Sequence, residues 1–309
     1  MTLFLSERDV QELLTPADAV EAVEASFHRM AAGTVEIAPR RRLGLEEGRL
    51  ADMAAADLEL GYAGVKAYAG FAEGAAFAVA LFAVDRPELV AVIEADHLGR
   101  LRTGAASAVA ARYLAREGAQ SLGVIGCGGQ AEAQVACIRA AVPGIDRVVA
   151  YCRTGRNLRA FCERVGAEPA ESNRDAAEHD VVVTITTSRD PVLRGEWLRP
   201  GALVCAAGAN NPASRELDNV VLERASLVCC DWREQAQLES ADLIEPVQQG
   251  VLDWLEVHEL HEIVSGELPG RQSPDDIVLF KSNGIAAWDV AIAAAAVERA
   301  RARRVGTDV

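Results

Sequence analysis

Ser121–Ala131 reads SLGVIGCGGQA, and this stretch decides the fold. Its apolar run Leu122–Ile125 predicts a buried strand, Gly126 begins a tight turn, and a helical pattern follows. Gly126 and Gly128 hold the first two positions of the dinucleotide-binding fingerprint, and Ala131 holds the third, an accepted variant. Glycine lets the backbone approach a pyrophosphate, whose charge is attracted by the N–H groups of a helix N-terminus. The stretch therefore predicts a phosphate-binding turn.

Five later segments are also short, continuous apolar runs rather than alternating ones. They are Arg147–Tyr151, Asp180–Ile185, Ala202–Ala207, Leu227–Cys230 and Ile277–Phe280. Strands that are covered on both faces of a parallel sheet have this pattern. Helical segments such as Leu158–Val165 separate several of the runs, which favours right-handed crossovers. The sequence predicts an α/β fold with a Rossmann doubly wound parallel sheet over residues 115–285; the alternative is an α/β domain whose switch point binds nothing.

The first part of the chain has a different pattern. Two apolar runs, Ala76–Val84 and Leu89–Ile93, flank a turn and predict a hairpin in an antiparallel sheet. Thr103–Leu114 is Ala-rich and helical, as is Ala286–Arg304, which we expect to pack back on the N-terminal region. Such Ala-rich helices pack closely, so this surface also allows a dimer contact. A second, discontinuous α+β domain is therefore predicted over residues 1–114 plus 286–309.

The composition is that of an enzyme-sized protein with a sizeable core. The chain has 309 residues, of which 50% are hydrophobic, and a formal net charge of -15. Such an acidic chain is a poor partner for nucleic acid or an anionic membrane, and no apolar run approaches the ~20 residues that span a bilayer. The N-terminus, MTLFLSERDV, lacks the basic start of a signal peptide, so we expect a cytoplasmic protein. The 7 Cys and 5 His show no metal-ligand spacing, and no metal is predicted.

Several motifs occur in order along the chain. They are RTGAAS (Arg102–Ser107), GCGGQA (Gly126–Ala131), PVLRGEWLRPG (Pro191–Gly201), RELD (Arg215–Asp218) after Gly208, and FKSNGI (Phe280–Ile285). With these motifs the chain resembles the ornithine cyclodeaminase and mu-crystallin family nearly end to end. The resemblance implies a homodimer, a Rossmann domain for NAD(P), and an N-terminal domain for dimerisation and substrate binding that the C-terminal helix completes. It also implies chemistry at the α-carbon of an amino acid or its imine.

Members of the family differ in their reaction. The cyclodeaminases place a catalytic Asp at the position of Asn210 and a Glu at that of Ala51, two residues before Met53. An Asn amide does not shuttle protons at neutral pH. Asp52 is one residue from the second position, so a register difference stays open. The absence of two acid–base groups favours net redox chemistry over cyclodeamination.

Three basic residues match the substrate site of the family. By this resemblance Lys66 and Arg102 are the catalytic candidates, and they bind substrate together with Arg40 and Asn210. The planar guanidinium of an Arg suits a carboxylate, and Lys66 can either hold the carboxylate or protonate the substrate nitrogen. Arg41 and Arg42 adjoin Arg40, so which of these three faces the site stays open.

The end of the second strand bears on the choice of cofactor. NAD enzymes usually place an Asp or Glu there, but Tyr151–Asn157 reads YCRTGRN. Arg153 and Arg156 can pair with a 2′-phosphate, and Thr154 can donate a hydrogen bond to it. NADP(H) is therefore favoured, and NAD(H) stays possible. The full set of predicted cofactor-binding residues is Thr103, Gly126, Gly128, Gly129, Gln130, Arg153, Thr154, Asn157, Thr186, Thr187, Gly208 and Ser282.

The predicted function is reduction of a C=N bond. The substrate is an imino acid, either a cyclic ketimine or one formed from an α-keto acid and ammonia, and the product is an L-amino or imino acid. NAD(P)H supplies the hydride. Two alternatives stay open: conversion of ornithine to proline with bound NAD, and non-enzymatic ligand carriage of the kind that mu-crystallin relatives represent.

Overall fold

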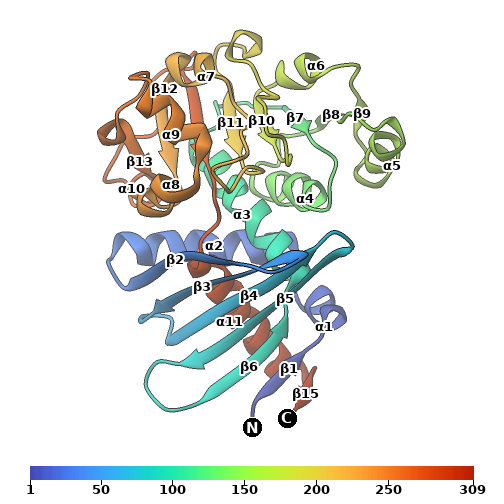
Figure 1. The fold of residues 1–309 in the computed structure, drawn as a ribbon, viewed down its shortest axis with the longest axis vertical. Helices are drawn as coiled ribbons and strands as arrows, with labels where there is room; N and C mark the ends of the chain where they lie inside the picture. Colours follow the sequence, from blue (N-terminus) through green and yellow to red (C-terminus); the bar gives the residue numbers. More distant parts are fainter. The chain divides into compact units, whose positions relative to one another are not determined.

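The computed structural model describes residues 1–309 and separates into two compact units. Unit 1 comprises Met1–Arg102 and Ile285–Val309, and unit 2 comprises Thr103–Gly284. Each unit is built around its own β-sheet (Figure 1). The first boundary lies inside helix α3 (Asp96–Leu114), not after residue 114, because this helix begins earlier than its Ala-rich part indicates.

The sheet of unit 2 has eight strands in the order β13-β12-β14-β11-β10-β7-β8-β9, and every neighbouring pair is parallel. The strands are β7 (Ser121–Ile125), β8 (Arg147–Tyr151), β9 (Glu168–Pro169), β10 (Val181–Thr184), β11 (Leu203–Ala206), β12 (Ala225–Cys230), β13 (Val257–Glu259) and β14 (Ile277–Lys281). All residues of β10, β11 and β14 are buried. The predicted α/β class with a parallel sheet is confirmed.

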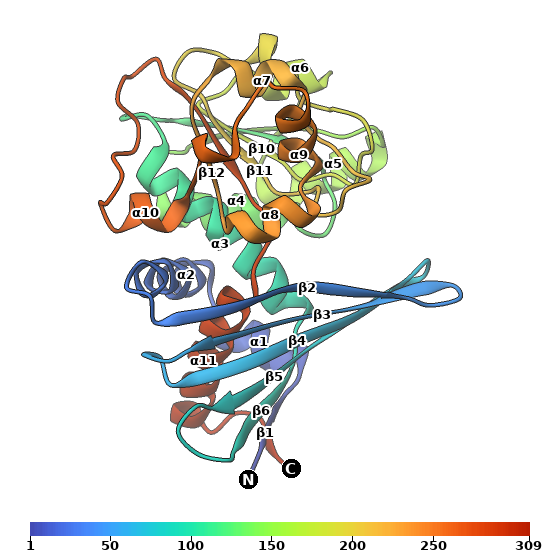
Figure 2. The ribbon, with the colours of Figure 1, turned by 60° about the vertical axis from the view of Figure 1, so that its left-hand side comes forward.

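Helices cover both faces of this sheet (Figures 1 and 2). They are α4 (Ala131–Ala141), α5 (Gly155–Val165), α6 (Asn173–Ala177), α7 (Asn219–Arg224), α8 (Arg233–Glu239), α9 (Ala241–Gln248) and α10 (Leu260–Val264), with the 3-10 turns η1 (Gly195–Trp197) and η2 (Trp254–Glu256). On one face, Val204 of β11 belongs to the same apolar cluster as Ala176 of α6 and Val221 of α7. The next residue of the strand, Cys205, points the other way and lies 3.8 Å from the Ser107 carbonyl oxygen of α3.

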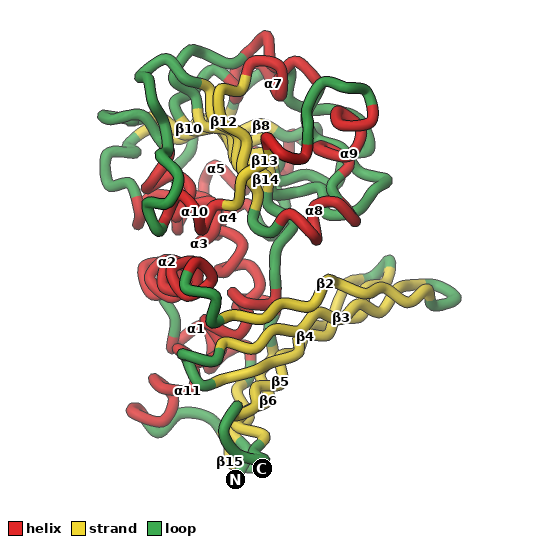
Figure 3. The backbone as a smooth tube through the Cα atoms, turned by 90° about the vertical axis from the view of Figure 1, so that its left-hand side faces the viewer, coloured by secondary structure: helices red, strands yellow, loops and turns green.

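The sheet of unit 1 has seven strands in the order β15-β1-β6-β5-β4-β3-β2. They are β1 (Leu3–Leu5), β2 (Val35–Gly44), β3 (Gly48–Asp57), β4 (Tyr62–Phe71), β5 (Gly74–Ala83), β6 (Leu89–Glu94) and β15 (Thr307–Asp308). Strands β2 to β6 are antiparallel neighbours, so the hairpin expected at β5 and β6 is present. The tips of the β2–β3 and β4–β5 hairpins extend together beyond β6 (Figures 2 and 3).

Three helices complete unit 1: α1 (Glu7–Leu13), α2 (Pro16–Ala31) and α11 (Ala286–Arg303). Helix α11 packs against β3, β4 and α2. Its Trp288 is fully buried, and its ring centroid lies 5.3 Å from that of Phe27 in α2. Most of α11 is buried in this way within unit 1, so little of its Ala-rich surface is exposed to a partner. No helix of the protein combines the length and apolar character needed to cross a bilayer.

Candidate active site

Lys66 is a buried cation on β4. Its side chain is 3% exposed, and its Nζ donates a hydrogen bond of 2.7 Å to Oδ1 of Asp289 on α11. Gly99 of α3 leaves room for this ammonium group, because a Cβ at residue 99 would lie 2.8 Å from Nζ. The Nζ atom also lies 5.7 Å from the centroid of the Phe77 ring, on the neighbouring strand β5. Packing from three elements therefore fixes the position of the amine.

Two arginines complete a buried group that we call the cationic cluster: Arg40, Lys66, Arg102 and Asp289. The Nε of Arg102 lies 3.3 Å from the same Oδ1 of Asp289. Arg40, on β2, is 8% exposed, and its Nη2 lies 3.6 Å from the Sδ of Met53. Lys66 and Arg102 thus share one carboxylate, and Arg40 adds a third positive charge close enough to act on Lys66. A buried site with excess positive charge attracts an anion, and a guanidinium suits a carboxylate.

The environment of Lys66 changes its protonation. Burial lowers the pKa of Lys66 to about 8; the carboxylate of Asp289 opposes that effect, and the charges of Arg102 and Arg40 add to it. At neutral pH the amine is still mostly protonated, but it releases a proton far more readily than an exposed lysine does. This is the behaviour needed of a general acid near neutral pH.

The structure distinguishes the three neighbouring arginines of β2. Arg40 is buried, whereas the Arg41 side chain is 80% exposed and pairs with Asp52 at 2.7 Å. Along β3, Ala51 and Met53 are each 1% exposed, while Asp52 between them faces the other side of the strand. Asp52 therefore does not replace the acid that is missing at Ala51.

Unit 2 contains a cavity of about 310 Å³ at the carboxyl ends of β7, β8 and β10, where ligands bind in open α/β sheets. It is lined by Ile125, Gly126, Cys127, Gly128, Tyr151, Cys152, Arg153, Thr154, Asn157, Asn173, Ile185, Thr186, Thr187, Ser188 and Val192. Seven of the predicted cofactor residues thus lie around one cavity, with Tyr151, Asn173 and Ser188 as polar neighbours that sequence reasoning missed.

The turn at the start of α4 fits a pyrophosphate group. Gly126 has a φ of 111°, and a Cβ there would lie 2.5 Å from the Ile185 carbonyl oxygen, so only glycine is accommodated. A Cβ at Gly128 would meet nothing, which leaves that side of the turn accessible. The N–H of Ala131 donates to the Gly128 carbonyl oxygen at 3.1 Å, but no side chain caps α4, so the positive end of its dipole stays open to an anion. The Oε1 of Gln130, at the N-cap, is buried without a hydrogen bond.

The part of the cavity beside β8 has no acidic lining residue. Arg153 and Thr154 are exposed there, and Thr154 makes no capping hydrogen bond with its side chain at the start of α5. Arg156 does not line the cavity. The Asp or Glu that usually binds the ribose diol of NAD is therefore absent from the lining of this cavity.

The remaining predicted residues of unit 2 lie elsewhere. Gly129 and Gln130 belong to the turn before α4, and Thr103 accepts a hydrogen bond from Gln134 through its carbonyl oxygen. Ser282 is buried and donates to Asp231 at 3.2 Å. Gly208 and the half-buried Asn210 lie on the loop that follows β11. None of them lines the cavity.

Asp289 was not predicted as a site residue. The sequence did contain a signal, because Asp289 is the one charged residue in the otherwise apolar stretch from Ala286 to Val297. A buried carboxylate requires a partner. Only the fold shows that the partner lies more than two hundred residues earlier in the chain.

Comparison with known proteins identifies the family of this chain. A family model described as the ornithine cyclodeaminase/mu-crystallin family matches residues 1–304. The chain belongs to this family.

Members of the ornithine cyclodeaminase/mu-crystallin family similar to this chain include enzymes of known activity. The chain is 36% identical over 323 residues to an alanine dehydrogenase from Archaeoglobus fulgidus, covering 100% of this chain and 98% of the relative. Its fold matches a Thermococcus litoralis Δ1-pyrroline-2-carboxylate reductase in complex with NADH and L-proline, with a TM-score of 0.95, 30% identity and full coverage of both chains. It also matches an archaeal alanine dehydrogenase dimer with bound NAD, with a TM-score of 0.93, 33% identity, and coverage of 100% and 98%.

Proposed function

We propose that this protein is an NAD(P)H-dependent imine reductase. It reduces the C=N bond of an imino acid, cyclic or formed from an α-keto acid and ammonia, to an L-amino or imino acid. The observation that carries this proposal is the buried amine of Lys66, whose pKa lies at about 8 and which shares Asp289 with Arg102. The similar enzymes named above support the class, since alanine dehydrogenase and pyrroline-2-carboxylate reductase both act at a C–N bond beside a carboxylate.

The residues of unit 1 have separate roles in this proposal. Arg102 and Arg40 bind the substrate carboxylate, which fixes the orientation of the adjacent carbon. Lys66 donates a proton to the imine nitrogen, because a protonated C=N carbon is a far better hydride acceptor. Asp289 holds the amine in place and keeps it charged at neutral pH. A nicotinamide cofactor, when bound, supplies the hydride.

Two positions argue against cyclodeamination by this chain. Asn210 and Ala51 stand where cyclodeaminases have acids, and Asp52 faces away from Met53 and pairs with Arg41. The chain therefore lacks the second acid–base group that ring closure with loss of ammonia requires. Net reduction needs one proton donor, and Lys66 supplies it.

A nicotinamide cofactor follows from the family, and we propose that NADP(H) is preferred to NAD(H). Arg153 supports this preference because it lines a cavity without a carboxylate. Replacing Arg153 with Asp should shift the preference toward NADH by about tenfold, since a carboxylate repels a 2′-phosphate and accepts a bond from a 2′-hydroxyl. The measurement is kcat/KM with each cofactor. A higher kcat/KM with NADH than with NADPH for the unmodified protein would contradict the preference.

We also propose that the protein is a homodimer. The outer face of the unit 1 sheet carries an apolar depression of about 400 Å³, lined by residues such as Ile37, Val65 and Phe82. Val65 is 38% exposed and Phe82 is 40% exposed, which is unusual for large apolar side chains that lie side by side. Light scattering of the purified protein measures the mass directly, and a monomer at micromolar concentration would contradict this assignment.

The central test is turnover. Purified protein should oxidise NADPH in the presence of Δ1-pyrroline-2-carboxylate, or of pyruvate with ammonia, and form the corresponding L-amino or imino acid. A parallel assay supplies ornithine with catalytic NAD. Robust formation of proline there, with no imine reduction, would replace the proposal with cyclodeamination and show that Asn210 is no obstacle to it.

A further inference from the structure

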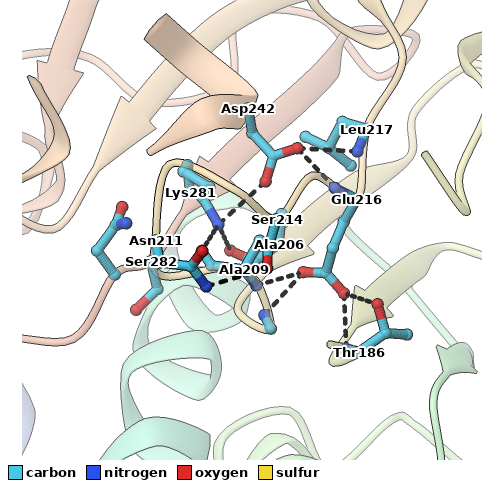
Figure 4. A network of polar contacts seen from close by, with 12 residues as sticks. Thr186, Ala206, Ala209, Asn211, Ser214, Glu216, Leu217, Asp242, Lys281 and Ser282 are labelled. Carbon is cyan, nitrogen blue, oxygen red and sulfur yellow. Dashed lines mark hydrogen bonds and ion pairs between the residues drawn. The ribbon is translucent and has the colours of Figure 1, made fainter. Parts of the chain in front are cut away.

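Glu216 joins two loops of unit 2 (Figure 4). It is fully buried, and one of its carboxylate oxygens accepts hydrogen bonds from the N–H and the hydroxyl of Thr186, at 2.6 and 2.8 Å. The other oxygen accepts from the N–H groups of Gly208 and Ala209, at 2.7 and 3.1 Å. Thr186 follows β10 and Gly208 follows β11, so a single carboxylate holds the carboxyl ends of two adjacent strands together.

Asp242 and Lys281 bind the backbone on either side of this carboxylate and each other. Asp242 of α9 accepts hydrogen bonds from the N–H groups of Glu216 and Leu217, at 2.8 and 2.9 Å. Lys281, at the end of β14, lies 3.2 Å from Asp242 and donates a bond of 2.6 Å to the carbonyl oxygen of Ala209. These three charged side chains, Glu216, Asp242 and Lys281, form what we call the Glu216 network.

Burying the three charged side chains of the network costs free energy, and a close-packed core does not need charged side chains at these positions. The three side chains have no exposed surface, and burial raises the pKa of Glu216 although the charge of Lys281 opposes that effect. Apolar side chains of similar volume stabilise a core at least as well as buried ion pairs do. The loops are also too close for any other residue at 208, because a Cβ there would lie 2.2 Å from the Thr186 nitrogen. An arrangement this specific indicates a requirement for loop position.

We infer that Glu216 is a positioning residue for the cofactor, supported by Asp242 and Lys281. Thr186 lines the cavity that we assign to the cofactor, and the bonds of Glu216 fix it relative to the loop that carries Asn210. The inference rests on the proposed use of a nicotinamide cofactor. Glu216 itself does not line the cavity, so it acts through Thr186 and the Gly208 loop and not by contact with a ligand.

The decisive variant is Glu216→Gln. A glutamine keeps one oxygen and replaces the other with an NH2 group, so it can satisfy the donors of Thr186 or those of Gly208 and Ala209, but not both. The released loop must be ordered again when the cofactor binds. We expect the dissociation constant for NADPH, measured by its fluorescence, to rise about tenfold to a hundredfold. The KM for the cofactor should rise by far more than the KM for the imine.

Glu196→Gln is the matched control, because the same chemical change there affects a side chain that is 64% exposed and has an ion pair of 3.8 Å with Arg194. It should bind NADPH as the unmodified protein does. A folded Glu216→Gln protein with unchanged NADPH affinity would overturn the inference, even if its melting temperature fell. Because this titration needs no turnover, weakened binding without any imine reduction would support the inference and count against the proposed reaction.

A measurement on the unmodified protein covers the case in which Glu216→Gln does not fold. Hydrogen exchange of the free protein should show the amides of Thr186, Gly208 and Ala209 protected together, since one carboxylate accepts from all three. Rapid exchange of these amides that slows only when NADPH is added would overturn the inference, because the cofactor and not Glu216 would then order the loops.

Discussion

The cationic cluster of unit 1 and the Glu216 network of unit 2 are both buried charge assemblies, but they differ in their balance of charge. In the network, both oxygens of Glu216 accept two bonds each, and Lys281 reaches two carbonyl oxygens. In the cluster, Oδ1 of Asp289 lies 2.7 Å from Nζ of Lys66 and 3.3 Å from Nε of Arg102, and Arg40 is a third buried cation. The cluster has three cations and one carboxylate, which suits a site that receives an anion, whereas the network has one cation and two carboxylates that hold backbone N–H groups, which suits a support. The balance of positive and negative charge separates the two functions.

The strongest test of this contrast exchanges each lysine for methionine. Lys66→Met should lower kcat by about a hundredfold, since a positioned general acid contributes on the order of 10²–10⁴. Its melting temperature should hardly fall, because burial already disfavours the charged amine. Lys281→Met should behave in the opposite sense and lower the melting temperature, because it leaves Glu216 and Asp242 as two buried carboxylates without a cation. Steady-state kinetics and thermal unfolding check both variants; unchanged turnover in Lys66→Met would refute its role.

A second test asks whether the cationic cluster binds the carboxylate of the substrate. Arg102→Ala should raise the KM for the imine by about tenfold to a hundredfold, because a charge-assisted bond to the substrate is lost. Its affinity for NADPH should be unaffected. Arg41→Ala is the control, since that side chain is 80% exposed and pairs with Asp52. Equal effects of the two substitutions on the KM would mean that general charge, and not the buried geometry, attracts the substrate.

A smaller effect is expected from the one carboxylate of the cluster. A reaction that needs protonated Lys66 is fast below a pH of about 8 and slows as the pH rises through that value. Asp289 raises the pKa of Lys66, so Asp289→Asn should move this alkaline limb to lower pH, by about one unit. The profile of kcat between pH 6 and pH 10 measures the shift. Asp242→Asn should leave the limb in place, and a shift toward higher pH in Asp289→Asn would contradict the assignment.

Features that leave a local pattern in the sequence could be predicted, and features that depend on tertiary contacts could not. The parallel sheet was predictable because strands buried on both faces, such as Val181–Thr184, are uninterrupted apolar runs. Strands β1 and β15 were missed because two or three residues carry no periodicity. Motifs proposed Lys66 and Arg102 as site residues, and the structure places both beside Asp289. Asp289 itself was not predicted, because its partner comes from a distant part of the chain.

The network was missed for a related reason. Glu216 lies within a quoted motif, yet nothing in RELD shows that its carboxylate bonds to loops after two different strands. The order of the strands in the sheet brings these loops together, and that order is a property of the tertiary fold. Residues that act through backbone N–H groups leave no pairing pattern in the sequence.

The division of unit 1 between the two ends of the chain has a consequence for biosynthesis. Residues 103–284 are complete before the ribosome reaches α11, so unit 2 can fold while unit 1 still lacks the helix that covers its sheet. During that interval the ammonium of Lys66 has no Asp289 beside it, and the apolar face that Trp288 later covers is open to water. The buried ion pair of Lys66 is therefore completed only once α11 has been synthesised, and a chain truncated before residue 286 is expected to be a target for chaperones and proteases.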